Sequence, residues 1–241
     1  MATLNNNFPI VQNTTVHKID YSGTAIKVVT SKGTITARGC ICTVSIGVLK
    51  SEKIKFFPTL SSNVQKALDG IQMGLLIKIP LLFDGSRLGF TENSFLQYDI
   101  EPEDIGSGCY FLAWPTGHDY IVGFIGGQFA WNLSKQGQNE IVEYAFSKLE
   151  ALSGGNIRKH FLKGFATDWA TNPLTEGSYS AVKPGCYGVR KLLSEPIAEK
   201  LMFAGEATTG NKAGLVNGAY ESGKMAAIRI ANFIKLKNKS H

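Results

Sequence analysis

Alternating apolar and polar positions predict strands in the first part of the chain. Short runs rich in β-branched residues lie at 11–19, 26–30 and 35–42, and turn residues separate them. We therefore predict a meander of hairpins over residues 10–42. The following segment, 42–49, is expected to leave this sheet.

Two signals mark the start of the middle region. Ser61 or Ser62 is placed to cap a short helix over residues 63–70. The segment 75–83 is almost entirely apolar and predicts a strand. Pro80 interrupts it, and proline is tolerated in a sheet mainly at an edge or a bend, so we expect this strand to be bent or to lie at an edge.

The rest of the middle region mixes strands and helices. The segment 139–152 has apolar residues at helical spacing and predicts an amphipathic helix. The segment 172–185 is rich in Pro, Gly and Ser, and its length suggests a functional loop. Further strands are predicted at 90–99, 109–114, 120–124 and 157–169, and a short helix at 186–198.

The chain ends in a predicted strand, turn and helix over residues 201–234. The apolar run 201–204 breaks at Gly205-Glu206, and helical spacing begins near Gly214. Such a turn points backbone N–H groups and a helix N-terminus at the negative end of a ligand. The stripe expected to pack on a sheet consists of Val216, Ala219, Tyr220, Gly223, Ala227, Ile230 and Ile234.

This order of elements predicts an α+β or α/β fold with a discontinuous domain. Residues 1–50 and 186–241 would form one domain around an inserted domain at 51–185. The insert would carry a mixed sheet flanked by helices, and nothing in the sequence indicates an internal repeat.

Composition narrows the choice of class. The chain has 241 residues, of which 44% are hydrophobic, so it can bury a substantial core. Its net charge of +6 is spread thinly, and the densest run is Lys235, Lys237 and Lys239. We interpret that run as a solvated helix end, with nucleic-acid or membrane contact as the minor alternative. No signal peptide is visible, and no apolar run is long enough to span a bilayer.

The cysteines and histidines do not suggest a metal site. Four cysteines lack zinc-ligand spacing, and Cys40 and Cys42 lie two apart on a predicted strand, which places both side chains on one side. We interpret them as free thiols in a reducing cytosol, so we expect a cytoplasmic protein. The four histidines are scattered along the chain.

Five residues are candidates for chemistry. Lys78 lies inside an apolar strand, so it must snorkel, pair or face a polar cavity. Glu206 could accept hydrogen bonds from ligand hydroxyls or cap the following turn. Trp114, Trp169 and Tyr179 stand near loops, where ordinary packing is the alternative interpretation.

Several ordered segments together resemble flavin-containing amine oxidases, the family of monoamine oxidases, polyamine oxidases and flavin-dependent histone demethylases. The resemblance covers nearly the whole chain. It rests on residues 43–50 (TVSIGVLK), 54–58 (IKFFP), 73–79 (MGLLIKI), 168–169 (DW), 177–180 (GSYS), 184–185 (PG), 203–208 (FAGEAT) and 214–223 (GLVNGAYESG).

The resemblance implies a site for FAD at the ends of the chain. Val16 would lie where the main chain contacts the adenine. Gly205 would begin the turn that covers the cofactor, and Glu206 would approach its ribityl or pyrophosphate part. Leu215 and Val216 would lie near the pyrimidine end of the flavin ring, at a positive helix terminus that suits negative charge there.

The resemblance also implies roles in amine oxidation for the middle region. Lys78 would hold a water near flavin N5. Trp169 would pack beside the flavin, and Tyr179 would form one wall of an aromatic cage for a neutral amine. The substrate would be a small amine, with a polyamine as the finer candidate, and the products would be an imine and H₂O₂.

Two departures from the family pattern change what we expect. Leu215 stands at a cage position that is often aromatic, which argues against a two-aromatic cage. The sequence has no G-x-G-x-x-G after a strand, the motif that binds the ADP half of FAD. We therefore expect the C-terminal half of a family member. It would self-associate or take the other half from a partner. The alternative is a non-catalytic remnant, a binding or scaffold module without FAD.

Overall fold

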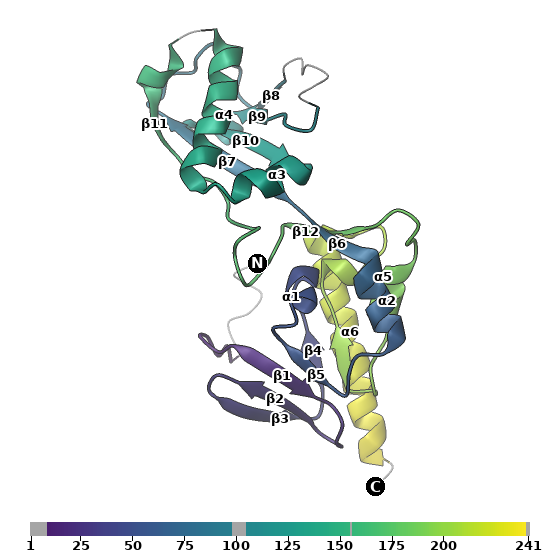
Figure 1. Ribbon diagram of the computed structural model, residues 1–241. Coiled ribbons are helices and arrows are strands. Elements are labelled where there is room, and N and C mark those ends of the chain that lie inside the picture. Colours follow the sequence, from purple (N-terminus) through teal and green to yellow (C-terminus); the bar gives the residue numbers. More distant parts are fainter. Residues whose placement is uncertain (1–8, 98–104, 155, 240–241) are drawn as a thin grey trace. The chain divides into compact units, whose positions relative to one another are not determined.

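The computed structural model describes residues 9–97, 105–154 and 156–239 and divides into two compact units (Figure 1). Unit 1 comprises the described residues up to Ile71 and from Val182 onward, and unit 2 is Gln72–Ala181. The fold is of the expected mixed α and β class, and the first unit is discontinuous. The division differs from the predicted 50/51 and 185/186 boundaries.

The larger sheet of unit 1 is built mainly from the first hairpins. Strands β1 (Val16–Asp20), β2 (Ile26–Thr30) and β3 (Gly33–Ala37) pair antiparallel in sequence order, as the predicted meander requires. Strand β5 (Lys55–Phe57) joins β1 in parallel, so the sheet has the order β3-β2-β1-β5 among the described residues. The pairing of β5 with β1 assigns residues beyond 50 to unit 1.

The predicted single strand at 35–42 was wrong, because the chain changes sheets at Gly39. Strand β4 (Cys40–Cys42) pairs in parallel with β13 (Leu201–Phe203) instead of extending β3. A Cβ on Gly39 would lie 2.5 Å from Cγ2 of Ile230. Only a glycine allows the chain to pass this close to the last helix while it moves to the second sheet.

Helices cover the strands of unit 1. Ser61 Oγ accepts a hydrogen bond from the Val64 N–H and caps α2 (Ser62–Gly70), as predicted. Ser45 caps α1 (Ile46–Lys50) in the same way, in a segment where no helix was predicted. The remaining helical segments of the unit are α5 (Val189–Leu193), η5 (Glu206–Thr208) and α6 (Val216–Lys239).

Helix α6 packs through a narrower stripe than its sequence predicted. Ala226 and Ile230 are buried against Met202 and Ala204 of the β13 segment. The prediction was wrong for three stripe members, which are exposed: Val216, Tyr220 and Ala227. These residues are exposed because the sheet beneath α6 is short. Strands β4 and β13 are each three residues long and cover little of the 24-residue helix.

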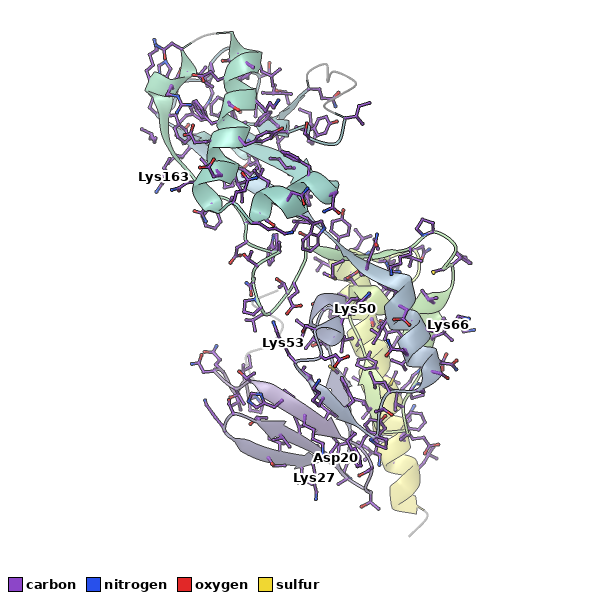
Figure 2. All side chains as sticks on the ribbon, viewed as in Figure 1. Asp20, Lys27, Lys50, Lys53, Lys66 and Lys163 are labelled. Atoms are coloured by element: carbon purple, nitrogen blue, oxygen red, sulfur yellow. The ribbon has the colours of Figure 1, made fainter. Side chains whose placement is uncertain are left out.

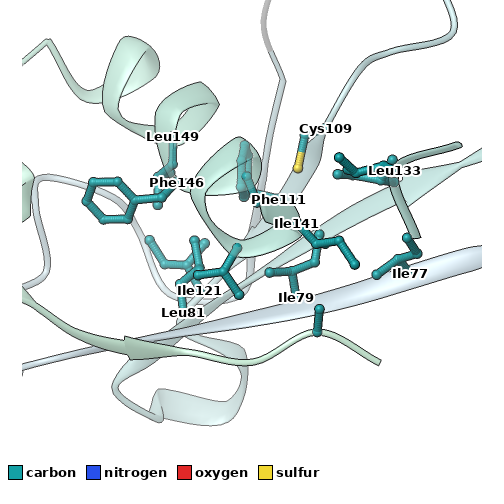
Figure 3. Close-up of a cluster of buried hydrophobic side chains, with 14 of the residues drawn as sticks. Ile77, Ile79, Leu81, Cys109, Phe111, Ile121, Leu133, Ile141, Phe146 and Leu149 are labelled. Carbon is teal, nitrogen blue, oxygen red and sulfur yellow. The ribbon is translucent and has the colours of Figure 1, made fainter. Parts of the chain in front are cut away.

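Unit 2 is an antiparallel sheet with helices on one face. Its order is β11-β7-β10-β9-β8 among the described residues. The strands are β7 (Leu76–Phe83), β8 (Ser94–Leu96), β9 (Tyr110–Ala113), β10 (Tyr120–Gly126) and β11 (Phe161–Gly164). Helices α3 (Gly127–Ser134) and α4 (Gln138–Ser153) bury the core (Figure 3), and α4 matches the helix predicted at 139–152.

Three strand predictions in unit 2 need correction. Strand β7 is not an edge strand over its whole length, because β10 and β11 flank it, but β11 pairs with residues 81–83 and Pro80 lies just beyond that pairing. Pro80 is tolerated there because no ladder hydrogen bond from its nitrogen is needed beyond the regular part of β11. Its carbonyl accepts a hydrogen bond from the Phe165 N–H. The strand predicted at 157–169 begins instead with the 3₁₀ turn η4 (Ile157–His160). Of the segment 90–99, β8 is a strand, and residues 98–99 lie outside the described part.

Two further pieces complete the chain. Strands β6 (Ile71–Gly74) and β12 (Tyr179–Val182) pair with each other and contain the two points where the chain passes from one unit to the other. Strand β12 lies inside the segment predicted as a loop, and the predicted helix at 186–198 shortens to α5.

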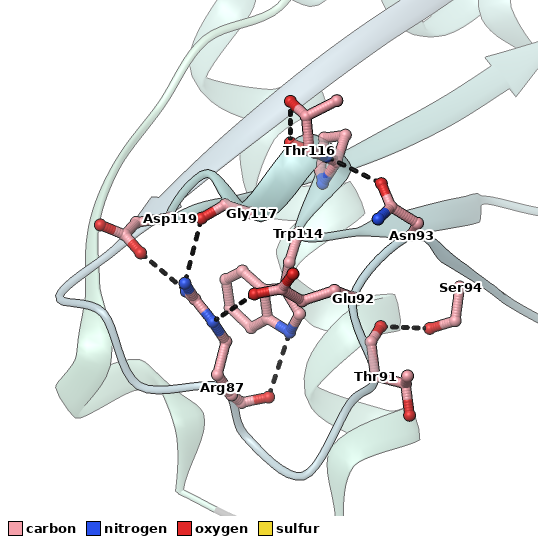
Figure 4. Close-up of polar contacts among 10 residues, drawn as sticks. Arg87, Thr91, Glu92, Asn93, Ser94, Trp114, Thr116, Gly117 and Asp119 are labelled. Carbon is pink, nitrogen blue, oxygen red and sulfur yellow. Dashed lines mark hydrogen bonds and ion pairs between the residues drawn. The ribbon is translucent and has the colours of Figure 1, made fainter.

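Trp114 belongs to the structural support of unit 2 (Figure 4). Its side chain is fully buried and lies under the Arg87 guanidinium, 5.0 Å from ring centre to Cζ. Arg87 donates to Asp119 Oδ1 at 2.7 Å and to the Gly117 carbonyl at 3.1 Å. This arrangement fixes the turn that contains η3 (Pro115–Gly117), so packing accounts for Trp114.

The surface charge is dispersed. The lysines labelled in Figure 2 lie on separate elements, including β2, α2 and β11. In the described residues, no helix is long and apolar enough to cross a membrane, and no group of three His, Cys, Asp or Glu side chains could hold a metal ion. All four cysteines are free thiols, as expected.

Candidate functional site

Lys78 lies on the face of the unit 2 sheet that the helices leave open. Along β7 the side chains alternate, so Ile77 and Ile79 are buried in the core and Lys78 is exposed. Its direct neighbour across the antiparallel pair is Phe124 of β10. The lysine therefore stands on an accessible face beside an aromatic residue.

A threonine hydroxyl holds the main chain of Lys78 in place. The Lys78 N–H donates to Thr167 Oγ1 at 3.0 Å, and the Thr167 N–H donates to the Lys78 carbonyl at 3.0 Å. In a regular antiparallel pair the Thr167 carbonyl would accept the first of these bonds. Because the hydroxyl takes its place, the chain can turn away from β7 directly after Thr167.

Trp169 follows two residues after this contact. Its carbonyl accepts hydrogen bonds from the Gly177 N–H at 2.7 Å and from Thr175 Oγ1 at 3.0 Å, which close the loop that begins at Trp169. A Cβ on Gly177 would lie 2.6 Å from Cβ of Met73, and its φ is +137°, so this close approach needs a glycine. Trp169 is 39% exposed.

Tyr179 follows a second hydroxyl contact with β7. Ser178 Oγ accepts from the Leu76 N–H at 3.0 Å and donates to the Leu76 carbonyl at 3.1 Å. The Tyr179 ring lies on Gly74, where an added Cβ would come within 2.8 Å of its Cε2. Tyr179 is 41% exposed. The segments that carry Lys78, Trp169 and Tyr179 are thus joined within unit 2.

The sequence did not single out the aromatic row beside Lys78. Phe124 pairs with Lys78 on one side and with Tyr110 on the other, so the three side chains lie in one cross-strand row. Directly opposite residues have Cβ atoms about 5 Å apart. The available signal was the alternation in YIVGFIG, which puts residues 120, 122 and 124 on one face, but the pairing of the strands was needed to align that face with Lys78.

In unit 1, Gly205 leaves the end of β13 in a conformation that favours glycine. Its φ is +135°, and in the described part of the chain no heavy atom beyond its chain neighbours lies within 4 Å of the position a Cβ would take. Its N–H donates to Ser222 Oγ of α6 at 3.1 Å, and Ser222 Oγ lies 2.5 Å from Thr208 Oγ1. The turn is thereby fixed on α6 while open space remains on its outer side.

Glu206 links this turn to the start of α6. Its Oε2 accepts a hydrogen bond from the Gly214 N–H at 2.7 Å, so the capping alternative is realised in the structure. Arg190 is buried and donates to the carbonyl of Ala207 at 3.0 Å. Burial lowers the pKa of Arg190, and the Glu206 charge opposes that shift. Arg190 was also absent from the predicted site.

The predicted cofactor residues of unit 1 fall into two places. Leu215 and Val216 lie directly after Gly214 at the start of α6 and are exposed, so the Glu206 bond brings them to the Gly205 turn. Val16 lies in another sheet, where it begins β1 opposite Thr30.

Comparison with known proteins identifies the family. A family model described as flavin containing amine oxidoreductase matches residues 9–231. The chain belongs to this family. Lysine-specific histone demethylase 1 homolog 2 of Arabidopsis thaliana is 31% identical over 235 residues, which cover 94% of this chain and 32% of that protein. Polyamine oxidase 4 of Oryza sativa subsp. japonica is 32% identical over 239 residues, covering 93% of this chain and 47% of that protein.

A solved structure supports the fold of this flavin amine oxidoreductase chain. Cyclohexylamine oxidase from Brevibacterium oxydans IH-35A aligns with a TM-score of 0.74 and 20% identity, covering 91% of this chain and 48% of that chain. The chain thus spans between about a third and a half of the length of these relatives.

The family implies a flavin, and the turn after β13 fits such a group. Gly205 offers backbone with free space where a side chain would stand, and the first residues of α6 are exposed next to it. A helix N-terminus favours negative charge, which a reduced flavin carries. These features fit the ring and ribityl part of the group.

Proposed function

We propose that this chain takes part in FAD-dependent oxidation of an amine to an imine. The amine loses two hydrogens, and O₂ takes them up as H₂O₂. The observation that carries the proposal is Lys78, an exposed cation in an otherwise apolar strand. Its main chain is bonded to the segment of Trp169, and Leu76 of the same strand is bonded to the segment of Tyr179. In a member of this family, that group of residues is suited to amine oxidation.

The flavin supplies the acceptor for hydride from the carbon next to the amine nitrogen. In unit 2, Lys78 would hold a water by donating from its ammonium group, and Tyr179 would orient the neutral amine with its ring face. Trp169 would exclude solvent next to these groups. Correct positioning is the main contribution that such side chains make to the rate.

In unit 1, we propose that Gly205 and Glu206 bind the ribityl side of FAD and that Leu215 and Val216 lie against the ring. Val16 would contact the adenine through its main chain. Glu206 Oε2 accepts the Gly214 N–H, which holds the carboxylate at the turn where the ribityl hydroxyls are proposed to lie.

The substrate class is proposed as a small amine, and a polyamine is the finer candidate. One curated relative is named as a polyamine oxidase and another as a lysine-specific histone demethylase. Both names describe amine chemistry, which supports an amine as the substrate here.

We further propose that this chain associates with a second polypeptide or with another copy of itself. Apolar side chains exposed on α6, including Tyr220, Met225 and Ile228, support association with a further surface. A binding module without FAD is the alternative.

A visible spectrum of the purified chain tests the proposal. A flavin band that survives desalting, followed by bleaching when an amine is added without oxygen, is the expected result. A panel of monoamines, polyamines and methylated lysine peptides would then rank substrates by H₂O₂ release. A chain that takes up no FAD, alone or with co-expressed family members, would rule out the oxidase proposal and favour the binding module.

A further inference from the structure

Two hydroxyl side chains replace a missing strand partner along β7. Beyond Gly164 the regular pairing of β11 with β7 ends, and the chain contacts β7 only at intervals. The Thr167 hydroxyl accepts the Lys78 N–H, and the Ser178 hydroxyl satisfies both main-chain groups of Leu76. The two contacts fall at alternate residues, the spacing at which one side of a strand presents its hydrogen-bonding groups.

Each hydroxyl also holds the chain just before a predicted site residue. Trp169 lies two residues after Thr167, and Tyr179 directly follows Ser178. The bond from the Gly177 N–H to the Trp169 carbonyl joins the two segments to each other. The main-chain positions of Lys78, Trp169 and Tyr179 are therefore linked through two short side chains to which no role in the reaction itself is assigned.

We propose that Thr167 and Ser178 are positioning residues for amine oxidation. Their hydroxyls hold the main chain of β7 at Lys78 and Leu76, and thereby keep the Lys78 ammonium in register with the two aromatic rings. This inference rests on the proposed function. A threonine side chain stands at the Lys78 contact because its hydroxyl reaches the Lys78 N–H while its own main chain turns away toward Trp169.

Hydrogen exchange of main-chain amides tests the contacts without a flavin. Thr167→Val keeps the shape but removes the acceptor, so exchange at Lys78 should accelerate about tenfold. The amides of Ile77 and Ile79, which face β10 in the alternating pattern, should not change and serve as references. Ser178→Ala should accelerate exchange at Leu76 in the same way.

Two control variants separate the contact from general disturbance. Thr167→Ser keeps an oxygen at the same place and should restore slow exchange at Lys78. Thr171→Val removes a hydroxyl from the same loop, where it donates to the Asp168 carbonyl and does not contact β7, so β7 should be unaffected. Unchanged protection of Lys78 in Thr167→Val would overturn the inference.

Flavin reduction in the FAD-bearing protein tests the use of these contacts in the reaction. We expect Thr167→Val to lower the limiting rate of reduction by an amine about tenfold at unchanged flavin content, and Thr167→Ser to recover it. Equal limiting rates in Thr167→Val and the parent protein would overturn the positioning role. If the parent protein bearing FAD is reduced by no amine, the proposed function fails, and the exchange experiment alone decides whether the hydroxyls hold β7.

Discussion

Two glycines in α6 should respond differently to the same substitution. A Cβ on Gly218 would lie 2.2 Å from the Lys212 carbonyl oxygen and 2.9 Å from Lys212 Cβ. A Cβ on Gly223, about one and a half turns later, would meet no heavy atom within 4 Å among the described residues, apart from its chain neighbours and the backbone of its own helix. The pair therefore isolates the close approach of the loop before α6 from the general effect of replacing glycine in a helix.

The expected magnitudes follow from these distances. Alanine in a helix is favoured over glycine by about 1 kcal/mol, so Gly223→Ala should stabilise the chain by about that amount. Gly218→Ala gains the same stabilisation from the helix preference of alanine. However, its new Cβ would contact main-chain atoms of Lys212, which cannot rotate away. Overpacking of this kind costs about 1–3 kcal/mol. The free energy of unfolding of Gly218→Ala should therefore be lower than that of Gly223→Ala by about this cost.

Urea unfolding followed by far-ultraviolet circular dichroism measures the difference, because α6 is a long helix. The displaced loop should also weaken the bond from the Gly214 N–H to Glu206, so Gly214 should exchange its amide proton faster in Gly218→Ala only. The reasoning is refuted if the two variants are equally stable and protect Gly214 equally well.

Three further outcomes are expected. In the FAD-bearing protein, Lys78→Met should slow flavin reduction or reoxidation about tenfold or more in stopped-flow experiments. The far-ultraviolet circular dichroism should not change, because the side chain is exposed. Unchanged rates would remove Lys78 from the mechanism. Hydrogen bonds from Ser22, with a smaller effect of Lys18, lower the pKa of Asp20 to about 2. The stability that the Asp20 carboxylate contributes is therefore present above pH 3.8 and is lost as the pH falls toward 2. A carboxyl titration by NMR should show Ser22→Ala raising that midpoint, and an unshifted midpoint would contradict the assignment. Burial raises the pKa of the Cys109 thiol to about 12, so a thiol reagent should modify it only after unfolding, and rapid labelling of the native chain would show that the core opens.

Local signals in the sequence were sufficient for the elements that are long or capped. The α4 helix followed from apolar residues at helical spacing, and Ser61 marked the start of α2. The first hairpins followed from β-branched runs between turns. In each of these cases the residues that decide the structure are close in sequence, so a pattern within a few positions contains the answer.

Pairing between distant segments could not be predicted in this way. The departure of β4 from the first sheet depends on β13, about 160 residues away along the chain, and on the contact of Gly39 with Ile230. The exposed residues of α6 look like core residues in the sequence because hydrophobic spacing does not reveal how much support a helix meets. The hydroxyls of Thr167 and Ser178 resemble ordinary loop residues until β7 is placed beside them.

The hydroxyl contacts along β7 also bear on how this chain avoids aggregation. A strand whose main-chain N–H and carbonyl groups are free on one side is a template for a strand from another molecule. At Leu76 and Lys78 those groups are already occupied by Ser178 and Thr167, although no regular strand lies there. Side chains that close a sheet in this way leave its outer face uncovered while they deny the adjacent edge to a strand of another molecule.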